Sequence, residues 1–425
     1  MRPLYHFAPA ENWMNDPNGT YFDGKTYHLF YQYNPYGSSW GNICWAYATS
    51  KDLVNWTRRG VRLAPDKAAG EQFCFSGCCF AAKDKIKIFY TSIGFEDRAV
   101  AEHAKQIVCD AEPDFSHIAR KAQITSEIHP FRVREWRDPF VFSFRQNVYL
   151  LLAGTRDKRS CILLYRAQDE SLNRWDFSGE LFAVEGDILE CPNAAIFGDT
   201  MLLLYSSMRG GRVRYACGVF DGKTLSVREE GDTDFGTNAF YASNLSASAD
   251  GQTVLYGWLR EDLRGRSSPD GLYSGCLALP RLIRLNGYTP LFAPIGALAS
   301  LEGAALSPES TCEHARIRLA TEQNSSFVLR SGGGEGIFAN VSDGILHVRR
   351  QSKFPDANDA PLALPLGGAK ELDILLDGSA IEIFAQGRAL SFRFYAAEKE
   401  KRLFYGENVH NVRICEMHPA RFYDE

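Results

Sequence analysis

Asn15-Asp16-Pro17-Asn18-Gly19 is the stretch that reveals how this 425-residue chain folds. About ten residues further on lies a strongly apolar segment, Tyr27–Tyr31, which reads as a β-strand. Two more segments repeat this order of an acidic stretch and then an apolar one: Arg137-Asp138-Pro139 with Val148–Leu152, and Glu190-Cys191-Pro192 with Met201–Tyr205. The repetition predicts one structural unit used several times.

The apolar strands recur at a nearly constant spacing through the first 260 residues. The gaps are 59, 62, 53 and 53 residues between these anchors: Tyr27, Ile86, Val148, Met201 and Val254. A period of this length suggests propeller blades of about four strands each. Five anchors predict a five-bladed β-propeller. A sandwich with evenly spaced strands remains the alternative, because signals for short strands are degenerate.

The composition changes after Arg281. Residues 286–310 are rich in Gly, Ala, Pro and Ser, and alternating strands follow, for example 372–376 and 381–384. The fold class is therefore predicted as all-β, with a five-bladed propeller over residues 1–290, a linker over 291–310 and a C-terminal β-sandwich over 311–425.

Composition and charge narrow the function. A net charge of -5 without a basic stripe argues against a nucleic-acid partner. Eleven cysteines at scattered spacing indicate reduced thiols, and Cys74, Cys78 and Cys79 lack the second Cys/His pair that a metal site needs. No apolar run reaches the roughly 18 residues of a membrane span, and none at the N-terminus resembles a signal peptide. We therefore expect no metal, no membrane partner and a cytoplasmic location.

The three acidic stretches carry the chemistry. In a propeller the innermost strands surround a central channel, so Asp16, Asp138 and Glu190 are expected to meet there from equivalent blade positions. Converging carboxylates are what cleavage of a glycosidic bond requires. Taken singly, Asp-Pro-Asn-Gly is a common turn and Arg-Asp-Pro a local ion pair. Their convergence favours catalysis, and the chain is predicted to be a glycosidase.

Motifs along residues 1–290 support this interpretation. They occur in this order: Trp13–Gly19, His28–Pro35, Trp40-Gly41-Asn42, Phe75-Ser76-Gly77, Trp136–Pro139, Glu190-Cys191-Pro192, Gly257-Trp258 and Leu279-Pro280-Arg281. In this order they resemble glycoside hydrolase family 32, the invertases, inulinases, levanases and sucrose-6-phosphate hydrolases. The resemblance implies a five-bladed propeller with a sandwich, and a retaining attack on terminal β-D-fructofuranosyl residues of sucrose or short inulin- or levan-type oligosaccharides.

The resemblance also implies roles for the three acids. Asp16 would be the nucleophile, Glu190 the acid/base and Asp138 the stabiliser of the transition state. Two carboxyl groups about 5–5.5 Å apart permit direct attack with a covalent intermediate. Asp16 must stay ionised, and we expect backbone N–H groups of a tight Pro17-Asn18-Gly19 turn to hold its charge. Glu190 must carry a proton. Cleavage of the glycosidic bond needs only a proton donor and a nucleophile, so no cofactor is expected.

The other candidates are residues that would bind the small-molecule saccharide: Asn15, Gln32, Trp40, Phe75, Ser76 and Arg137. Trp40 and Phe75 have the alternative of being core aromatics. The family often has Trp-Gly-His where this chain has Trp45-Ala46-Tyr47, which makes Tyr47 a candidate influence on the leaving group. Three arginines on one predicted hairpin, Arg209, Arg212 and Arg214, would suit a phosphate or a solvated surface.

Several functions share this machinery. Hydrolysis of sucrose or short fructans is the leading prediction. The alternatives are fructosyl transfer through the same intermediate, hydrolysis of sucrose 6-phosphate, another propeller glycosidase acting on arabinosides, and a non-catalytic sugar-binding module. A binding module has no need of both Asp16 and Glu190.

Overall fold

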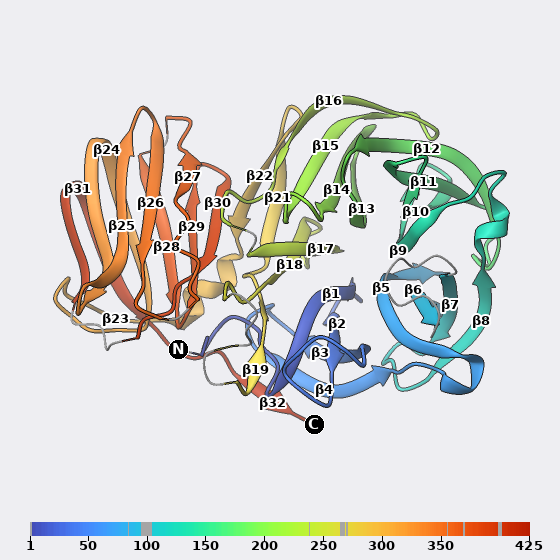
Figure 1. Cartoon of the computed structure of the whole chain (residues 1–425), viewed down its shortest axis with the longest axis horizontal. Coiled ribbons are helices and arrows are strands. Elements are labelled where there is room, and N and C mark those ends of the chain that lie inside the picture. The colour runs from blue at the N-terminus through green and yellow to red at the C-terminus, as the bar shows by residue number, and fades with distance from the viewer. Residues whose placement is uncertain are drawn as a thin grey trace.

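The structure is a computed structural model. It describes residues 2–425 except 84, 95–103, 238, 264–267, 269–270, 355, 369 and 398–401. The described part is all-β, as predicted, with a β-propeller formed by sheets arranged in a ring and a C-terminal β-sandwich-like region beside it (Figure 1). Apart from strands, the described residues contain three short 3₁₀ helices: η1 (Lys67–Ala69), η2 (Ser126–Ile128) and η3 (Gly296–Leu301).

Within the described residues, three sheets of the ring have four antiparallel strands each, joined in chain order. The first contains β5 (Glu71–Ala82), β6 (Lys85–Gly94), β7 (Lys105–Ala111) and β8 (Ile118–Ile124). The second contains β9 (Arg134–Phe144), β10 (Asn147–Arg156), β11 (Arg159–Ala167) and β12 (Trp175–Glu185). The third contains β13 (Leu189–Phe197), β14 (Thr200–Ser207), β15 (Arg212–Phe220) and β16 (Leu225–Asp232).

Two further sheets of the ring recruit strands from distant parts of the chain. One contains β1 (Asn12–Phe22), β2 (Tyr27–Asn34), β3 (Cys44–Ser50) and β4 (Trp56–Leu63), flanked by β19 (Tyr273–Ser274) and β32 (Phe422–Asp424). The other contains β17 (Phe240–Ala247), β18 (Thr253–Leu259), β21 (Arg281–Asn286) and β22 (Thr289–Pro294), with β20 (Cys276–Leu277) paired to β18.

The first strand of each sheet faces the centre of the ring. β1 contacts β5, β5 contacts β9, β9 contacts β13, β13 contacts β17, and β17 contacts β1, so these leading strands close a circle (Figure 1). The second strands are the apolar segments that the sequence predicted. Leu150, Leu151 and Leu152 of β10 are fully buried because both faces of this strand pack inside the propeller.

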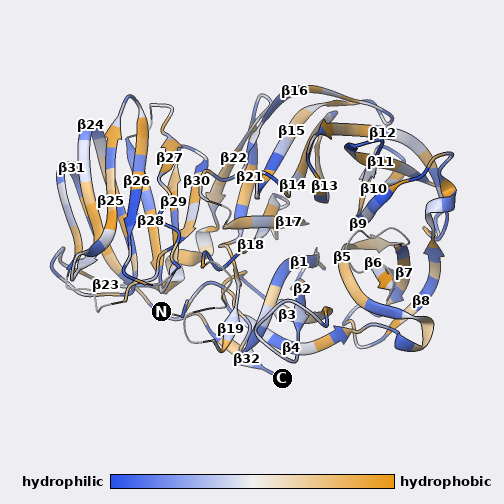
Figure 2. Ribbon diagram, in the orientation of Figure 1, coloured by the Kyte–Doolittle hydropathy of each residue, from blue (hydrophilic) through white to orange (hydrophobic). Residues whose placement is uncertain are grey.

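The C-terminal region is a separate layered sheet structure with its own apolar core. Its strands are β23 (Glu302–Ala305), β24 (His314–Gly332), β25 (Glu335–Ser342), β26 (Ile345–Gln351), β27 (Leu362–Pro365), β28 (Glu371–Asp377), β29 (Ala380–Ala385), β30 (Arg388–Arg393) and β31 (Arg402–Met417). Figure 2 shows hydrophobic and hydrophilic residues interleaved along these strands, which is the pattern of sheets with one buried face. After β31 the chain returns to the ring, where β32 pairs with β4.

All eleven cysteines lie in the described residues and are free thiols. No group of metal-ligating side chains was found among the described residues. The same part of the chain contains no helix that is long and apolar enough to cross a membrane.

A buried ionic cluster joins the N-terminal segment, the ring and the C-terminal region. The ring nitrogens of His6 lie 2.7 Å from Asp377 Oδ2 and 3.1 Å from Glu382 Oε1. Arg281 Nη2 lies 2.8 Å from both Glu382 Oε2 and Asp234 Oδ2. Breaking a buried pair leaves an uncompensated charge, which typically costs about 3–5 kcal/mol. The cluster therefore couples the packing of the three parts.

The cluster makes stability depend on pH. Burial lowers the pKa of His6, but the bonds and charges of Asp377 and Glu382 outweigh burial and leave that pKa raised. The His6 charge therefore stabilises the fold fully below the unfolded-state pKa of about 6.5, and this contribution is lost as pH rises through the raised folded-state pKa. We expect His6→Gln to lower the free energy of unfolding more at about pH 6 than at about pH 9.

Chemical denaturation at both pH values measures the difference. His117→Gln, at an exposed position, is the control. An equal loss of stability at the two pH values would show that His6 contributes through packing and not through charge.

Candidate active site

Every leading strand carries the same irregularity. Two residues on it oppose a single residue on the second strand, which is a β-bulge. The bulged pairs are Asn15 with Asp16 in β1, Phe75 with Ser76 in β5, Asp138 with Pro139 in β9, Cys191 with Pro192 in β13, and Ala242 with Ser243 in β17. A bulge redirects the side chains around it, so each leading strand can turn polar groups toward the centre.

The three acids occupy different places at these bulges. Asp16 is the second bulged residue of its strand, Asp138 is the first of its strand, and Glu190 directly precedes the bulge of β13. The expectation of equivalent blade positions is therefore wrong in detail. The bulge is shared, but each carboxylate is offset by one residue from the next.

The three acids nevertheless meet at one point, around Cys191. Cys191 Sγ lies 3.6 Å from Asp16 Oδ2, and the Cys191 backbone N–H donates to Asp138 Oδ2 at 2.8 Å. Glu190 is the neighbour of Cys191 in the chain. A small cavity of about 10 Å³ lies beside this point, with Asp138 in its wall, and its lining comes from β1, β5, β9, β13 and β17. The convergence predicted from the sequence is present.

Asp16 is held by side chains. Ser76 Oγ donates to Asp16 Oδ2 at 2.5 Å, and Asn15 Nδ2 donates to Asp16 Oδ1 at 2.9 Å. Gln32 connects these two donors, since its Oε1 accepts from Asn15 Nδ2 at 2.6 Å and its Nε2 donates to Ser76 Oγ at 2.6 Å. Trp13 Nε1 extends the network by donating to Asn15 Oδ1 at 2.7 Å.

This network replaces the turn that the sequence suggested. Pro17, Asn18 and Gly19 lie inside strand β1, and the described hydrogen bonds to the Asp16 carboxylate come from side chains. Gly19 serves packing, because it has a φ of +50° and an added Cβ would lie 2.8 Å from Cys79 Sγ. Burial raises the pKa of Asp16, and Glu190 adds to this shift, while the bonds from Ser76 and Asn15 oppose it.

Asp138 is buried and fixed by backbone contacts. Its own N–H donates to Thr91 Oγ1 at 2.8 Å, and its φ is +63°, a left-handed conformation that non-glycine residues rarely adopt. Burial raises the pKa of Asp138 to about 7, with Arg137 opposing and Glu190 adding to the shift.

Glu190 has a cation on one side and a phenol on the other. Arg137 Nη2 lies 3.5 Å from Glu190 Oε1 and also pairs with Glu135. The Tyr241 hydroxyl donates to Glu190 Oε2 at 2.5 Å. Burial and the nearby Glu190 charge raise the pKa of Tyr241, so this phenol stays protonated and remains a donor. The guanidinium of Arg260 stacks on the Tyr241 ring at 4.4 Å.

The predicted binding residues divide into two groups. Four of them are buried at the carboxylates. Asn15 and Ser76 bond to Asp16, Arg137 lies beside Glu190, and Gln32 reaches Asp16 only through Asn15 and Ser76. Trp40 is 47% exposed, and its ring lies 5.3 Å from Phe73 and 6.1 Å from Phe75. Trp40 and Phe75 thus form an aromatic surface next to Ser76. Contact with a sugar stays a prediction for all six residues.

Two other sequence-based candidates, Tyr47 and the arginine hairpin, form contacts with residues other than the three acids. Tyr47 is only 1% exposed, its hydroxyl lies 2.6 Å from His28 Nδ1, and its ring stacks on Phe30, so it belongs to the core and not to a leaving-group site. Arg212 and Arg214 both pair with Asp232. Arg209, the third of these arginines, is exposed on the turn between β14 and β15, where its backbone N–H donates to Asp187.

Sequence reasoning missed three contacts of the acids: the Tyr241 hydroxyl with Glu190, and Thr91 and the Cys191 backbone with Asp138. A signal existed for Tyr241, which opens the polar stretch Tyr241–Asn244 ahead of the fifth apolar strand, Val254 onward. Neither Tyr241 nor Thr91 belongs to a sequence motif that would mark it as a contact of a catalytic acid. Only the meeting of β13 with β17 brings the Tyr241 hydroxyl to Glu190.

Comparisons with known proteins agree with this geometry. The model of the glycosyl hydrolases family 32 N-terminal domain matches residues 6–293, and that of the family 32 C-terminal region matches residues 299–416. The chain is 27% identical over 437 residues to the sucrose-6-phosphate hydrolase of Escherichia coli, covering 94% of this chain and 91% of the relative. It is 28% identical over 445 residues to the raffinose invertase of Escherichia coli, covering 94% and 91%.

Solved structures show the same fold. Sucrose-6-phosphate hydrolase from Lactobacillus gasseri aligns with a TM-score of 0.86 at 21% identity, covering 98% of this chain and 93% of that one. Fructan 1-exohydrolase IIa from Cichorium intybus aligns with a TM-score of 0.84 at 19% identity, covering 100% and 98%. Together with the family models, which cover most of the sequence, these likenesses show that the chain belongs to glycosyl hydrolase family 32.

Proposed function

We propose that the protein is a retaining β-fructofuranosidase that removes terminal β-D-fructofuranosyl residues from sucrose or short fructo-oligosaccharides. The observation that carries this proposal is the meeting of Asp16, Asp138 and Glu190 around Cys191. Retaining cleavage needs one carboxylate as nucleophile and one carboxyl group as proton donor on the same bond. The side-chain contacts of the three acids support a separate role for each.

In the first step Asp16 attacks the anomeric carbon of the fructosyl unit. The bond from this carbon to the leaving-group oxygen breaks, and Glu190 gives its proton to that oxygen. The products are a fructosyl ester of Asp16 and the released sugar, glucose in the case of sucrose. Ser76 and Asn15 orient the attacking carboxylate through the bonds described above.

In the second step Glu190 acts as the base. It takes a proton from water, the water oxygen bonds to the anomeric carbon, and the ester bond to Asp16 breaks. Fructose leaves, and both carboxyl groups return to their starting states with one water consumed. Asp138 would accept hydrogen bonds from fructosyl hydroxyls, which strengthen as positive charge develops at the anomeric carbon. Arg137 offsets part of the negative charge.

The ring is proposed to have five blades. The closed circle of contacts through β1, β5, β9, β13 and β17 supports this number, as does the bulge that each of these strands carries. The division at residues 1–290, 291–310 and 311–425 stays a proposal. If the boundaries followed sheet membership, the propeller would extend to Pro294, where β22 ends, and would also include β32, which pairs with β4.

Hydrolysis of sucrose 6-phosphate is retained as an alternative, because Arg212 and Arg214 pair with Asp232 while the third arginine of the hairpin, Arg209, is exposed. Fructosyl transfer is the second candidate, because a sugar hydroxyl can replace water in the second step. A substrate panel with product analysis tests the proposal: sucrose, sucrose 6-phosphate, 1-kestose and longer fructans. We expect free fructose from sucrose and kestose. Turnover of sucrose 6-phosphate alone, or new oligosaccharides in place of fructose, would support the alternatives.

Tyr241 is expected to contribute to catalysis through Glu190. Tyr241→Phe removes the hydroxyl and leaves Glu190 Oε2 without this donor, while the buried ring and its stacking on Arg260 remain. A hydrogen bond to a charged group is worth about 1.5–3 kcal/mol, so kcat/KM on sucrose should fall roughly 10- to 150-fold. Steady-state kinetics beside thermal unfolding measure this. Unchanged kinetics in a folded variant would remove Tyr241 from the mechanism.

A further inference from the structure

Glu135 is a fourth carboxylic acid beside the candidate active site. It precedes Asp138 on the same strand, β9, and its side chain is only 11% exposed. Burying a carboxyl group is costly unless the group is paired, so an acid in this position needs a physical reason. The two-step reaction described above uses Asp16, Asp138 and Glu190 and gives Glu135 no role.

A second bulge of β9 fixes the direction of Glu135. Here Glu135 and Trp136 together oppose a single residue of β10, Gly154. The φ of Glu135 is +52°, in the left-handed region that non-glycine residues rarely adopt. The buried Trp136 anchors the bulge, since its Nε1 donates to the Tyr165 hydroxyl at 2.9 Å. A conformation of this kind persists where the surrounding packing holds it, so the Glu135 side chain has a defined place.

One nitrogen of Arg137 lies between two carboxylates. Arg137 Nη2 pairs with Glu135 Oε2 and lies 3.5 Å from Glu190 Oε1. Charge-assisted hydrogen bonds from nitrogen to a carboxylate are about 2.7–2.9 Å long, so this nitrogen is bonded to Glu135 and only adjacent to Glu190. The Arg137 side chain is 9% exposed, and water therefore screens these interactions weakly.

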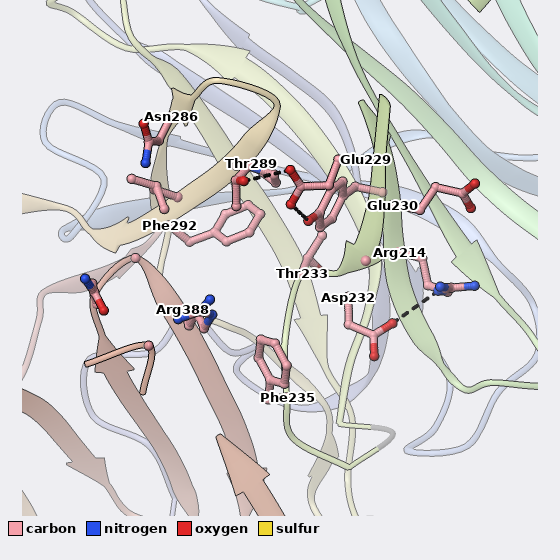
Figure 3. Close-up of a pocket in the computed structure, with 17 residues that line it drawn as sticks. Arg214, Glu229, Glu230, Asp232, Thr233, Phe235, Asn286, Thr289, Phe292 and Arg388 are labelled. Carbon is pink, nitrogen blue, oxygen red and sulfur yellow. Dashed lines mark hydrogen bonds and ion pairs between the residues drawn. The ribbon is translucent and has the colours of Figure 1, made fainter. Parts of the chain in front are cut away.

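Another acid of the ring has the opposite arrangement. Asp232 of β16 pairs with Arg212 Nη1 at 2.8 Å and with Arg214 Nε at 3.2 Å, and Figure 3 shows the pair with Arg214. There two cations serve one acid. At the candidate active site one cation serves two acids, so the charge of either glutamate changes what Arg137 contributes to the other.

The charges around both glutamates come from several strands. The groups that interact electrostatically with Glu190 are Asp16 of β1, three residues of β9 (Glu135, Arg137 and Asp138), Cys191 of β13, Tyr241 of β17 and Arg260 after β18. Glu135 interacts with Arg134, Arg137 and Glu190. Burial raises the pKa of Glu135, with Arg137 opposing this shift and the Glu190 charge adding to it. The two glutamates therefore influence each other across Arg137.

We propose that Glu135 is a positioning residue that keeps Arg137 from pairing fully with Glu190. By holding the guanidinium and adding a negative charge of its own, Glu135 makes the charged form of Glu190 less favourable than it would be beside Arg137 alone. This favours the protonated acid that the first step of the reaction needs. Once Glu190 has given up its proton, Arg137 is already beside it. The proposal rests on the proposed function, which makes Glu190 the proton donor.

The pH profile of kcat/KM on sucrose tests the proposal. Its basic limb reports loss of the proton from the essential acid of the free enzyme. Glu135→Gln keeps the size of the side chain and removes its charge, so we expect this limb to move to lower pH by about one unit. At pH values beyond the limb kcat/KM should then fall about tenfold, with little change on its acidic side.

Two further variants make the result specific. Glu135→Asp retains the negative charge and should move the basic limb less than Glu135→Gln does. Glu127→Gln is the matched control, because Glu127 is an exposed acid of η2, the short helix that precedes β9, and its loss should leave the profile unchanged. A basic limb that stays in place, or an equal loss of kcat/KM at every pH, in a folded Glu135→Gln protein would overturn the proposal.

A crystal structure of the Glu135→Gln protein adds a readout that needs no turnover. Arg137 Nη2 should lie within about 3 Å of Glu190 Oε1, in place of 3.5 Å. An unchanged distance would show that Glu135 does not hold Arg137 back, and would overturn the proposal. If the wild-type protein cleaves no fructoside, the proposed function is refuted, whereas the sharing of Arg137 is still decided by this distance.

Discussion

Replacing Asp16 by alanine is expected to reduce kcat on sucrose by a factor on the order of 10⁵ or more, the scale seen when a covalent nucleophile is removed from a hydrolase. The carboxylate is the group that would bond to the anomeric carbon, and neither Ser76 nor Asn15 can replace it, because both act as donors to Asp16. Without it, the ester intermediate cannot form. Release of fructose under saturating sucrose measures the loss.

Two controls make the Asp16→Ala result specific. Asp176→Ala changes an exposed acid on β12 and should retain full activity. Thermal unfolding of the Asp16→Ala protein should stay close to wild type, since the strand pairing of β1 does not use this side chain. Sucrose cleavage by the Asp16→Ala variant at near the wild-type rate would refute the nucleophile assignment.

Replacing Glu190 by glutamine is expected to lower kcat on sucrose by about 10²–10⁴-fold, the usual range for loss of a general acid/base. Glutamine keeps the size of the side chain and can still accept from Tyr241, so the geometry around β13 should persist. It cannot protonate the departing oxygen of glucose. The loss therefore falls in the chemical step and not in substrate binding, and KM should change little.

A substrate with a leaving group that needs no proton separates the two steps. With fructosyl fluoride, Glu190→Gln should still release fluoride in the first step, while the second step lacks its base and the ester on Asp16 accumulates. Mass spectrometry of the intact protein detects this adduct. Glu185→Gln, at an exposed position on β12, is the matched control. An equal loss on sucrose and on the fluoride would show that Glu190 does not act as the acid.

The stability of the site depends on parts of the chain that lie far from it in sequence. Gln32 of β2 bridges Asn15 and Ser76, which stand on two different leading strands. The Asp138 carboxylate on β9 accepts a hydrogen bond from the backbone N–H of Cys191 on β13, and the Asp138 backbone N–H donates to the Thr91 hydroxyl on β6. Each acid is therefore positioned by a neighbouring sheet, and closure of the ring is a condition for the chemistry.

The local pattern of the chain was sufficient for several features. The alternation of acidic stretches and apolar strands predicted the all-β class, and the apolar anchors are the second strands of their sheets. The three acids were identified because their unit repeats. These features are local, since an apolar run of strand length must be buried wherever the chain places it, and a repeat is visible without any contact being known.

Contacts between sheets decided the rest. The offset of Asp16, Asp138 and Glu190 about a shared bulge was not predictable, because a shift of one residue in a strand turns a side chain to the other face and leaves the hydrophobic pattern almost unchanged. Tyr241 of β17 reaches Glu190 of β13 in the neighbouring sheet, and Tyr47 is buried against His28 and Phe30. Sequence specified which strands form. The packing of one sheet against the next determined which side chains meet.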